Sequence, residues 1–263
     1  MSKIKIFQVD AFTDRLFSGN PAAICLLDDW MDDEQMQSIG AENNLAETAF
    51  VVSKENHFEI RWFTPTVEVD LCGHATLATA YVLFHCMGYQ GSEIIFNSTR
   101  SGELKAMQQK DLIFLDFPVD NLSISDFAEE IQGCIGIRPR EVYKGKTDYI
   151  AVVDSESDVR NLCPDIPAIS KLDARGLIVT AKGDEADFVS RFFGPQSGVD
   201  EDPVTGSAHT SLIPLWTKKL LKTEMTALQL SKRGGTLICM NKGSRCLIGG
   251  KAKLYMTGEI NIS

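Results

Sequence analysis

The chain has 263 residues, of which 44% are hydrophobic and 24% charged, and its formal net charge is −10. The acidic balance excludes nucleic acid and anionic membrane surfaces as predicted partners, because either would need a basic stripe to neutralise phosphates. No segment approaches the roughly 18 uninterrupted apolar residues of a membrane span, so we expect a soluble, globular protein of one large domain or two ordinary ones.

The cysteines and the N-terminal segment favour the cytoplasm. Seven cysteines are an odd number, widely spread and without a C-x-x-C pair, which fits reduced thiols better than a disulfide framework. The first 12 residues contain no basic stretch leading into an apolar one, and Asp10 and Asp14 interrupt the segment early. We therefore predict a cytoplasmic protein.

The first 117 residues consist mainly of short alternating runs, which are typical of strands. The predicted strands are 4–11, 22–27, 48–53, 58–64, 93–97, 103–107 and 112–117. Two helices interrupt them. The first starts near Asp32, and the second runs from Gly73 to about Met87, with Gly88 as its end. Apolar residues cover nearly the whole circumference of the second helix, so we expect sheet around most of it.

A domain junction is predicted at residues 118–125, where a proline and polar residues interrupt the pattern. The elements predicted after it are a helix at 126–134, strands at 149–154, 176–181 and 187–193, a helix from 206 to about 220, and closing strands from 227 onward. Pro214 should remove one backbone hydrogen bond from the later helix and bend it. Mixed strands with few, separated helices predict an α+β fold.

One motif, F-x-P-x-x-x-V-D, occurs twice, at 63–70 and 130 residues later at 193–200. Shortly after each copy, a Gly-polar-Ala step at 73–75 or 206–208 opens an apolar helix. Two copies of one unit predict a pseudo-twofold molecule with a cleft between its halves. We place the two domains at 1–117 and 118–263, with the alternative that the last strand returns to the first domain.

The two helix starts are candidate anion sites. A helix N-terminus exposes unpaired backbone N–H groups, and Gly73 and Gly206 would let a carboxylate approach the backbone closely. The alternative is that glycine, threonine and serine merely start the helices. Cys72 and His74 flank the first start, but the Cys-Gly-His triplet is too close for the usual ligand spacings, so no metal is predicted.

Two segments carry further chemistry. Glu47 lies between a helix end and an apolar strand, where partial burial would let it take and return a proton, although such a Glu is more commonly a surface residue. Residues 201–209 pack carboxylates, hydroxyls and an imidazole around the turn at Pro203, where Thr205 and Ser207 are either site residues or helix caps. Residue physics alone leaves these alternatives open.

Taken together, the motifs resemble the PhzF-like family of phenazine-biosynthesis proteins along nearly the whole chain. The matching segments are 9–13 with 19–23, 44–48, 72–76, 202–208 and 231–235. The resemblance implies the diaminopimelate epimerase fold: two pseudo-symmetric α+β domains, each a barrel-like sheet around a central helix, with the active site between them.

The resemblance also implies roles for matched residues. Glu47 would be the general acid/base, and His74, Asp202 and Ser207 would line the site and assist the substrate. The implied substrate-binding residues are Cys72, Gly73, Ala75, Thr205 and Gly206. His209 departs from the family's pattern, which could change how the far end of the substrate is held.

Racemising relatives use two facing thiols, whereas residues 202–208 contain no cysteine opposite Cys72. We therefore expect an isomerase, without metal or cofactor, in which Glu47 moves a proton on a small carboxylate-bearing metabolite of a biosynthetic process. The phenazine-pathway substrate is not transferred. A thiol-dependent epimerase using Cys72 and a non-catalytic metabolite-binding protein remain alternatives, and a homodimer is expected from base rates alone.

Overall fold

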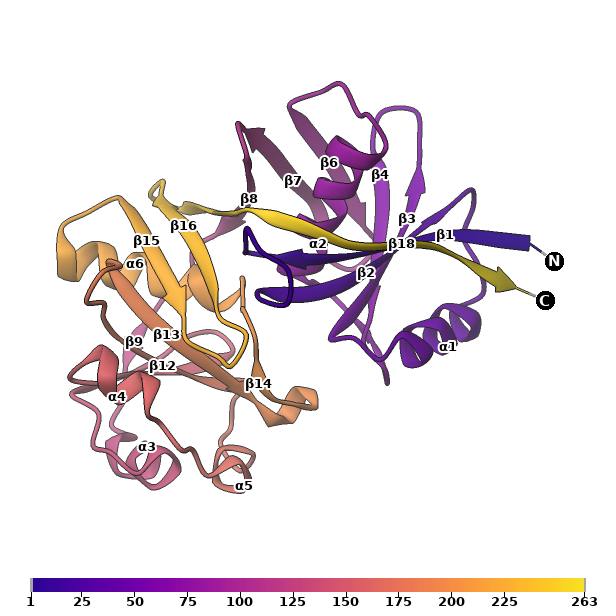
Figure 1. The fold of residues 1–263 in the computed structure, drawn as a ribbon. Coiled ribbons are helices and arrows are strands. Elements are labelled where there is room, and N and C mark those ends of the chain that lie inside the picture. Colours follow the sequence, from indigo (N-terminus) through magenta and orange to yellow (C-terminus); the bar gives the residue numbers. More distant parts are fainter. Residues whose placement is uncertain (1, 263) are drawn as a thin grey trace. The chain divides into compact units, whose positions relative to one another are not determined.

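The structure is a computed structural model that describes residues 2–262 and divides into two compact units (Figure 1). Unit 1 comprises the residues up to Asp116 together with those from Gly249 onward, and unit 2 comprises Phe117–Ile248. Every helix among the described residues is too short or too polar to cross a membrane.

Unit 1 is a strongly bent sheet with one helix inside it and one outside. Its strands are β1 (Ser2–Ala11), β2 (Asn20–Leu27), β3 (Glu47–Ser53), β4 (Phe58–Phe63), β5 (Glu68–Val69), β6 (Glu93–Ser98), β7 (Gly102–Gln109), β8 (Leu112–Pro118) and β18 (Ala252–Ile262). Its helices are α1 (Asp33–Asn43) and α2 (Gly73–Tyr81), the latter continued by the π-helical turn η1 (Val82–Cys86).

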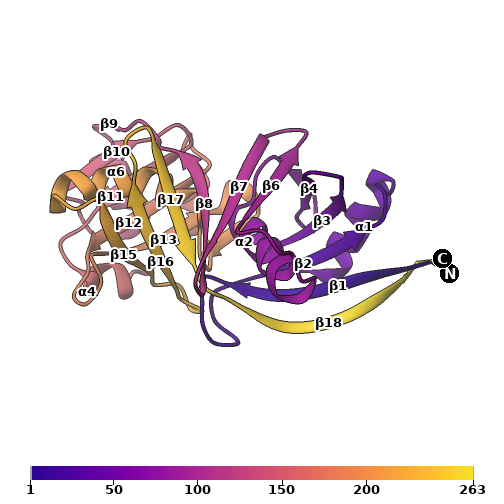
Figure 2. The same ribbon diagram turned by 90° about the horizontal axis from the view of Figure 1, so that it is seen from above.

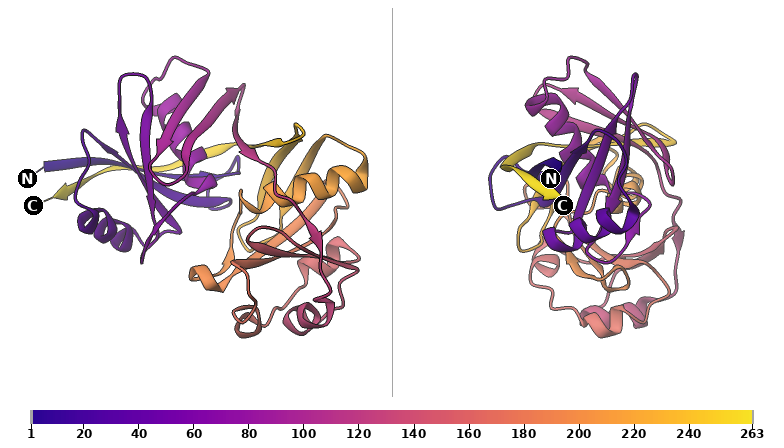
Figure 3. Two further views of the ribbon diagram at one scale, coloured as in Figure 1. Left: turned by 180° about the vertical axis from the view of Figure 1, so that it is seen from behind. Right: turned by 90° about the vertical axis from the view of Figure 1, so that its right-hand side faces the viewer.

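In unit 1 the last strand of the chain pairs with the first one. The last strand, β18, runs antiparallel to β1 along its whole length, and β1 pairs antiparallel with β2 (Figure 2). From there β2 is parallel to β3, β3 antiparallel to β4, β4 parallel to β6, and β6 to β8 form an antiparallel meander. The N- and C-terminal ends of the described chain therefore lie side by side (Figure 3).

The helices of unit 1 differ in burial because their sequences differ in pattern. Helix α1 is amphipathic: Met36 and Ile39 pack with Phe50 of β3 in one apolar cluster, while its other face is polar. In α2 every side chain from His74 to Ala80 is buried, and the helix contacts β1, β2, β3, β7 and β18. The expected enclosure of this helix by sheet is confirmed, although its last turn widens into η1 before Gly88 ends it with a φ of 70°.

Unit 2 repeats the strand plan of unit 1. Its strands are β9 (Ser123–Ile124), β10 (Glu141–Lys144), β11 (Asp148–Val152), β12 (Gly176–Lys182), β13 (Phe188–Gly194), β14 (Val199–Asp202), β15 (Glu224–Gln229), β16 (Gly235–Asn241) and β17 (Arg245–Gly250). Its helices are α3 (Ala128–Ile135), α4 (Glu156–Arg160), α5 (Ile166–Ile169), the 3₁₀ turn η2 (Pro195–Ser197) and α6 (Ala208–Leu220).

The pairing order shows that the two units have one topology. Strand β11 is parallel to β12, β12 antiparallel to β13, β13 parallel to β15, and β15 antiparallel to β16, which repeats the series from β2 to β7. The two copies of the F-x-P motif begin at equivalent places, with Phe63 ending β4 and Phe193 near the end of β13, both buried. The α+β fold and the repeat predicted from this motif are confirmed.

Strand β12 separates two apolar layers in unit 2. Leu177 and Val179 point toward α3, α4 and α5, which gather on one side of the strands (Figure 1). Because side chains alternate along a strand, Thr180 points to the other side, where its hydroxyl accepts a hydrogen bond of 3.0 Å from the Trp216 indole of α6. Trp216 also stacks on Phe188, with ring centroids 5.7 Å apart. Helix α6 is thus held by the opposite face of the same strands.

Candidate functional site

Three elements of unit 1 bring a cluster of polar side chains together, and we call Asn20, Glu47, Cys72 and His74 the unit 1 cluster. Asn20 and Glu47 are the first residues of the parallel neighbours β2 and β3, and His74 lies in the first turn of α2. His74 Nε2 is 3.1 Å from Glu47 Oε2, and His74 Nδ1 is 3.1 Å from Asn20 Nδ2 and 3.5 Å from Cys72 Sγ. Glu47, Cys72 and His74 were predicted to be site residues, and the structure places them in contact.

The cluster is largely removed from water. The side chains of His74 and Glu47 are 6% and 18% exposed, and Cys72 is buried. Burial raises the pKa of the Cys72 thiol to about 11, and the charge of Glu47 acts in the same direction. Burial acts to lower the pKa of His74, whereas Cys72 and Glu47 act to raise it, and the net result lies well above the usual value.

Glu47 has a carboxylate oxygen that is buried against His74. Oε2 lies 3.1 Å from His74 Nε2, at ion-pair distance, and no second hydrogen-bond partner for it is found among the described residues. Most buried polar atoms in proteins are hydrogen-bonded, and the imidazole is the group that meets this need here.

Of the remaining predicted residues, Gly73 and Ala75 flank His74 in the first turn of α2, while Asp202 ends β14 and Thr205, Gly206 and Ser207 form the turn before α6 in unit 2. Thr205 Oγ1 donates a 2.5 Å hydrogen bond to Asp202 Oδ2, and Gln229 of β15 holds the same turn by bonding the Thr205 amide, the Thr205 hydroxyl and the Asp202 carbonyl. Helix α6 begins at Ala208, two residues after the predicted start. Neither hydroxyl caps it in the expected way: the Ser207 side chain makes no cap hydrogen bond.

Ser207 is instead bonded to Arg175, a residue that the sequence reasoning missed. Arg175 Nη1 donates to Ser207 Oγ at 2.9 Å, while Nε and Nη2 form a bidentate pair with the nearly buried Asp148 at 2.9 and 2.5 Å. The guanidinium lies over the Phe192 ring, 5.1 Å from its centroid. This network fixes a cation and a hydroxyl at the start of α6.

The missed residues occupy the same topological position in unit 2 as the unit 1 cluster does in unit 1. Asp148 begins β11 and Arg175 directly precedes β12, as Asn20 begins β2 and Glu47 begins β3. In both units a side chain at the start of the central helix completes the group. The repeat therefore builds two polar clusters of different composition, one of Asn20, Glu47, Cys72 and His74 and the other of Asp148, Arg175 and Ser207.

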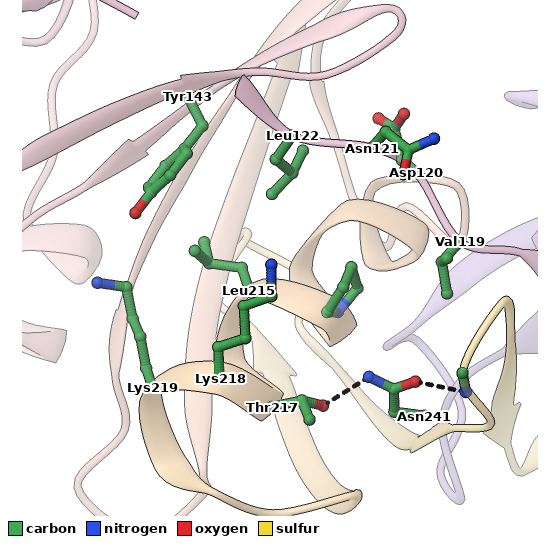
Figure 4. Close-up of a pocket in the computed structure, with 12 residues that line it drawn as sticks. Val119, Asp120, Asn121, Leu122, Tyr143, Leu215, Thr217, Lys218, Lys219 and Asn241 are labelled. Carbon is green, nitrogen blue, oxygen red and sulfur yellow. Dashed lines mark hydrogen bonds between the residues drawn. The ribbon is translucent and has the colours of Figure 1, made fainter. Parts of the chain in front are cut away.

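Unit 2 also contains a cavity of about 590 Å³ at the C-terminal half of α6 (Figure 4). Its lining residues are Val119, Asp120, Asn121, Leu122, Tyr143, Pro214, Leu215, Thr217, Lys218, Lys219, Asn241 and Gly243. Several polar groups of the wall are bonded to one another or to near neighbours: Lys219 pairs with Glu141, and Asn241 bonds Thr217 and Gly243. None of the predicted site residues lines this cavity.

His209 differs from the expectation that it contacts the far end of a substrate. It is fully buried in unit 2, donates from Nδ1 to the Thr205 carbonyl at 2.8 Å, and lies beside the Phe188 ring. Burial lowers the pKa of His209 to about 4, so the ring is neutral at pH 7. Its role in the described structure is to brace the turn at Thr205 from within the core.

Comparisons with known proteins agree with this fold. A model of the family described as "phenazine biosynthesis-like protein" matches residues 9–258. An "uncharacterized isomerase" of Pseudomonas aeruginosa is 50% identical over 260 residues, which cover 99% of this chain and 100% of the relative. The crystal structure of a PhzF-family protein of Enterococcus faecalis superimposes with a TM-score of 0.96 at 44% identity, covering 99% of this chain and 100% of the other. A "predicted epimerase" of Pseudomonas aeruginosa, at 18% identity and a TM-score of 0.77, shares the fold and covers 99% of this chain and 100% of the other.

The fold is that of the diaminopimelate-epimerase-like proteins, because each unit is a barrel-like sheet around a central helix. Within that class, the chain belongs to the phenazine biosynthesis-like, or PhzF, family. The resemblance inferred from the motifs is thereby confirmed.

Proposed function

We propose that the protein is an isomerase that uses neither metal nor cofactor and in which Glu47 moves a proton from one carbon to another of a small carboxylate-bearing metabolite. The observation that carries this proposal is the Glu47 carboxylate itself, which is largely buried and lies 3.1 Å from His74 Nε2. The name of the Pseudomonas relative supports the reaction class.

The proposed reaction balances without any external reagent. Glu47 removes a proton from an activated carbon, and the electron pair of the broken C–H bond is delocalised into the unsaturated system conjugated with the substrate carboxylate. The protonated Glu47 then returns the proton to a second carbon of that system, and the double bonds shift accordingly. His74, held by Asn20, fixes the orientation of the carboxylate.

Unit 2 favours this reaction over a thiol-dependent inversion. Two-thiol inversion needs a cysteine in each unit at equivalent positions, and the residue that matches Cys72 in the second copy of the repeat is Thr205, bonded to Asp202 and Gln229. The implied roles of Asp202, Thr205 and Ser207 in holding the substrate stay predictions, as do the cytoplasmic location and the homodimer. Full activity of Cys72→Ala would dismiss the remaining thiol alternative.

The test compares wild type with Glu47→Gln, which keeps the size of the side chain and removes its ability to take a proton. Each protein is incubated with a small-metabolite extract in D₂O, and mass spectrometry follows metabolites that gain one deuterium or change retention. We expect a change that depends on Glu47 and falls by about 10²-fold or more in the variant. Glu42→Gln, an exposed carboxylate in the preceding helix, is the matched control.

Equal deuterium incorporation by wild type and Glu47→Gln would refute the assignment of the base. Absence of any change with either protein, while an anionic metabolite still binds, would favour a metabolite-binding protein.

A further inference from the structure

Glu47, Cys72 and His74 have a second property besides proton transfer. One ligand atom from each residue, namely a carboxylate oxygen, Sγ and a ring nitrogen, lies within 4.8 Å of the other two. Among the residues that the structure describes, this is the one group of three such side chains that close together. The combination of thiolate, imidazole and carboxylate is a ligand set that zinc takes in proteins.

The distances approach those of a tetrahedral metal site. At usual bond lengths, a zinc-bound sulfur and nitrogen lie about 3.6 Å apart, and a zinc-bound nitrogen and oxygen about 3.4 Å apart. In the unit 1 cluster, His74 Nε2 is 3.1 Å from Glu47 Oε2, and Cys72 Sγ is 4.0 Å from Nε2 but 3.5 Å from Nδ1. Sγ therefore lies beside the ring, and a turn of the imidazole together with side-chain shifts is needed to place Nε2, Sγ and the carboxylate around one cation.

The neighbourhood of His74 supplies the support that a metal-bound histidine needs. Asn20 lies 3.1 Å from Nδ1, so that one orientation of its amide presents the oxygen to an Nδ1–H group. That hydrogen bond would leave the Nε2 lone pair for the metal. By turning its amide through 180°, the Asn20 side chain can therefore hydrogen-bond His74 whether or not Nδ1 carries a proton.

We propose that the unit 1 cluster binds one thiophilic divalent cation, such as Zn²⁺, through Cys72 Sγ, His74 Nε2 and Glu47, and that the bound cation inhibits the enzyme. On binding, the Cys72 thiol and a protonated His74 each lose a proton to solvent, and water fills the fourth position. The inhibitory role rests on the proposed function, because the cation occupies the carboxylate that would otherwise move the proton. Binding of the cation does not depend on that function.

The test titrates the purified full-length protein with Co²⁺, which reports thiolate ligation by a charge-transfer band in the near ultraviolet, and then displaces it with Zn²⁺. We expect one equivalent of Co²⁺ to produce the band. Cys72→Ser should abolish it, and Glu47→Gln should keep it while weakening binding at least about 10-fold. Cys163→Ser, which removes an exposed thiol outside the cluster, is the matched control and should bind as wild type.

A wild type without a saturable band, a band that survives Cys72→Ser, or unchanged affinity in Glu47→Gln would overturn the site. The metal titration needs no substrate, so its result is independent of whether the isomerase proposal holds. Once turnover is measured, Zn²⁺ should reduce it and a chelator should restore it, whereas full turnover with saturating Zn²⁺ would overturn the inhibitory role.

Discussion

Buried His209 should make the stability of the protein depend on pH in a defined window. The pKa of His209 is about 4 in the folded protein, against an ordinary value of 6.5 that we assign to the unfolded chain. Below pH 6.5 the unfolded state therefore binds a proton that the folded state does not. Stability is fully present above pH 6.5 and is lost as the pH falls toward 4.

The expected magnitude follows from the two pKa values. Integrated between pH 7 and pH 5, the difference corresponds to about 2 kcal/mol of unfolding free energy from this one group. The assay is urea denaturation of wild type and His209→Asn at both pH values. Asparagine keeps a donor for the Thr205 carbonyl but cannot titrate, so it should lose packing equally at both pH values.

Wild type should therefore lose about 2 kcal/mol more than His209→Asn between pH 7 and pH 5. Comparing the two proteins cancels the contributions of all other titrating groups. If wild type and His209→Asn weaken in parallel, the imidazole is not kept neutral by its burial and the reasoning fails.

Two further predictions concern stability. Arg175→Met leaves the nearly buried Asp148 carboxylate without its partner and should cost about 2 to 4 kcal/mol, whereas Asp148→Asn in the same chain should recover part of the loss in a double-mutant cycle followed by urea denaturation. Gly19→Ala should lower the free energy of unfolding by at least about 2 kcal/mol, because φ is +68° and a Cβ would lie 2.2 Å from the Ala11 carbonyl oxygen. Gly133→Ala, with open space around it in helix α3, should instead raise the free energy of unfolding by about 0.5 to 1 kcal/mol. Equal effects of the two glycine substitutions would contradict the backbone argument.

The sequence was most informative where structure is set locally. The apolar residues that surround nearly the whole helix from Gly73 correctly predicted its burial, and the F-x-P repeat correctly predicted two units of one topology. The starts of α1 and α2 were predicted within one residue, whereas α6 begins at Ala208 and not at Gly206. Helices α4 and α5, of five and four residues, are too short to show a helical period and were missed.

The site was predictable only in part, because its residues meet through strand pairing. Glu47 and His74 were chosen by their motifs, but their contact depends on β3 lying beside the start of α2, which no local pattern reveals. Asp148 and Arg175 carried one available signal, a single charged residue at the edge of each of two apolar runs. That signal becomes meaningful only once β11 and β12 are known to be parallel neighbours.

The long antiparallel pairing of β18 with β1 has a consequence for how the protein is made. During translation, β1 leaves the ribosome first but must wait for residues 252–262 before this edge is covered. Unit 2 is contiguous, from Phe117–Ile248, and can complete its sheet while the edge of β1 is still open. An uncovered strand edge invites pairing with other chains. The nascent first unit is therefore the part of the molecule most in need of protection by chaperones until synthesis reaches the last strand.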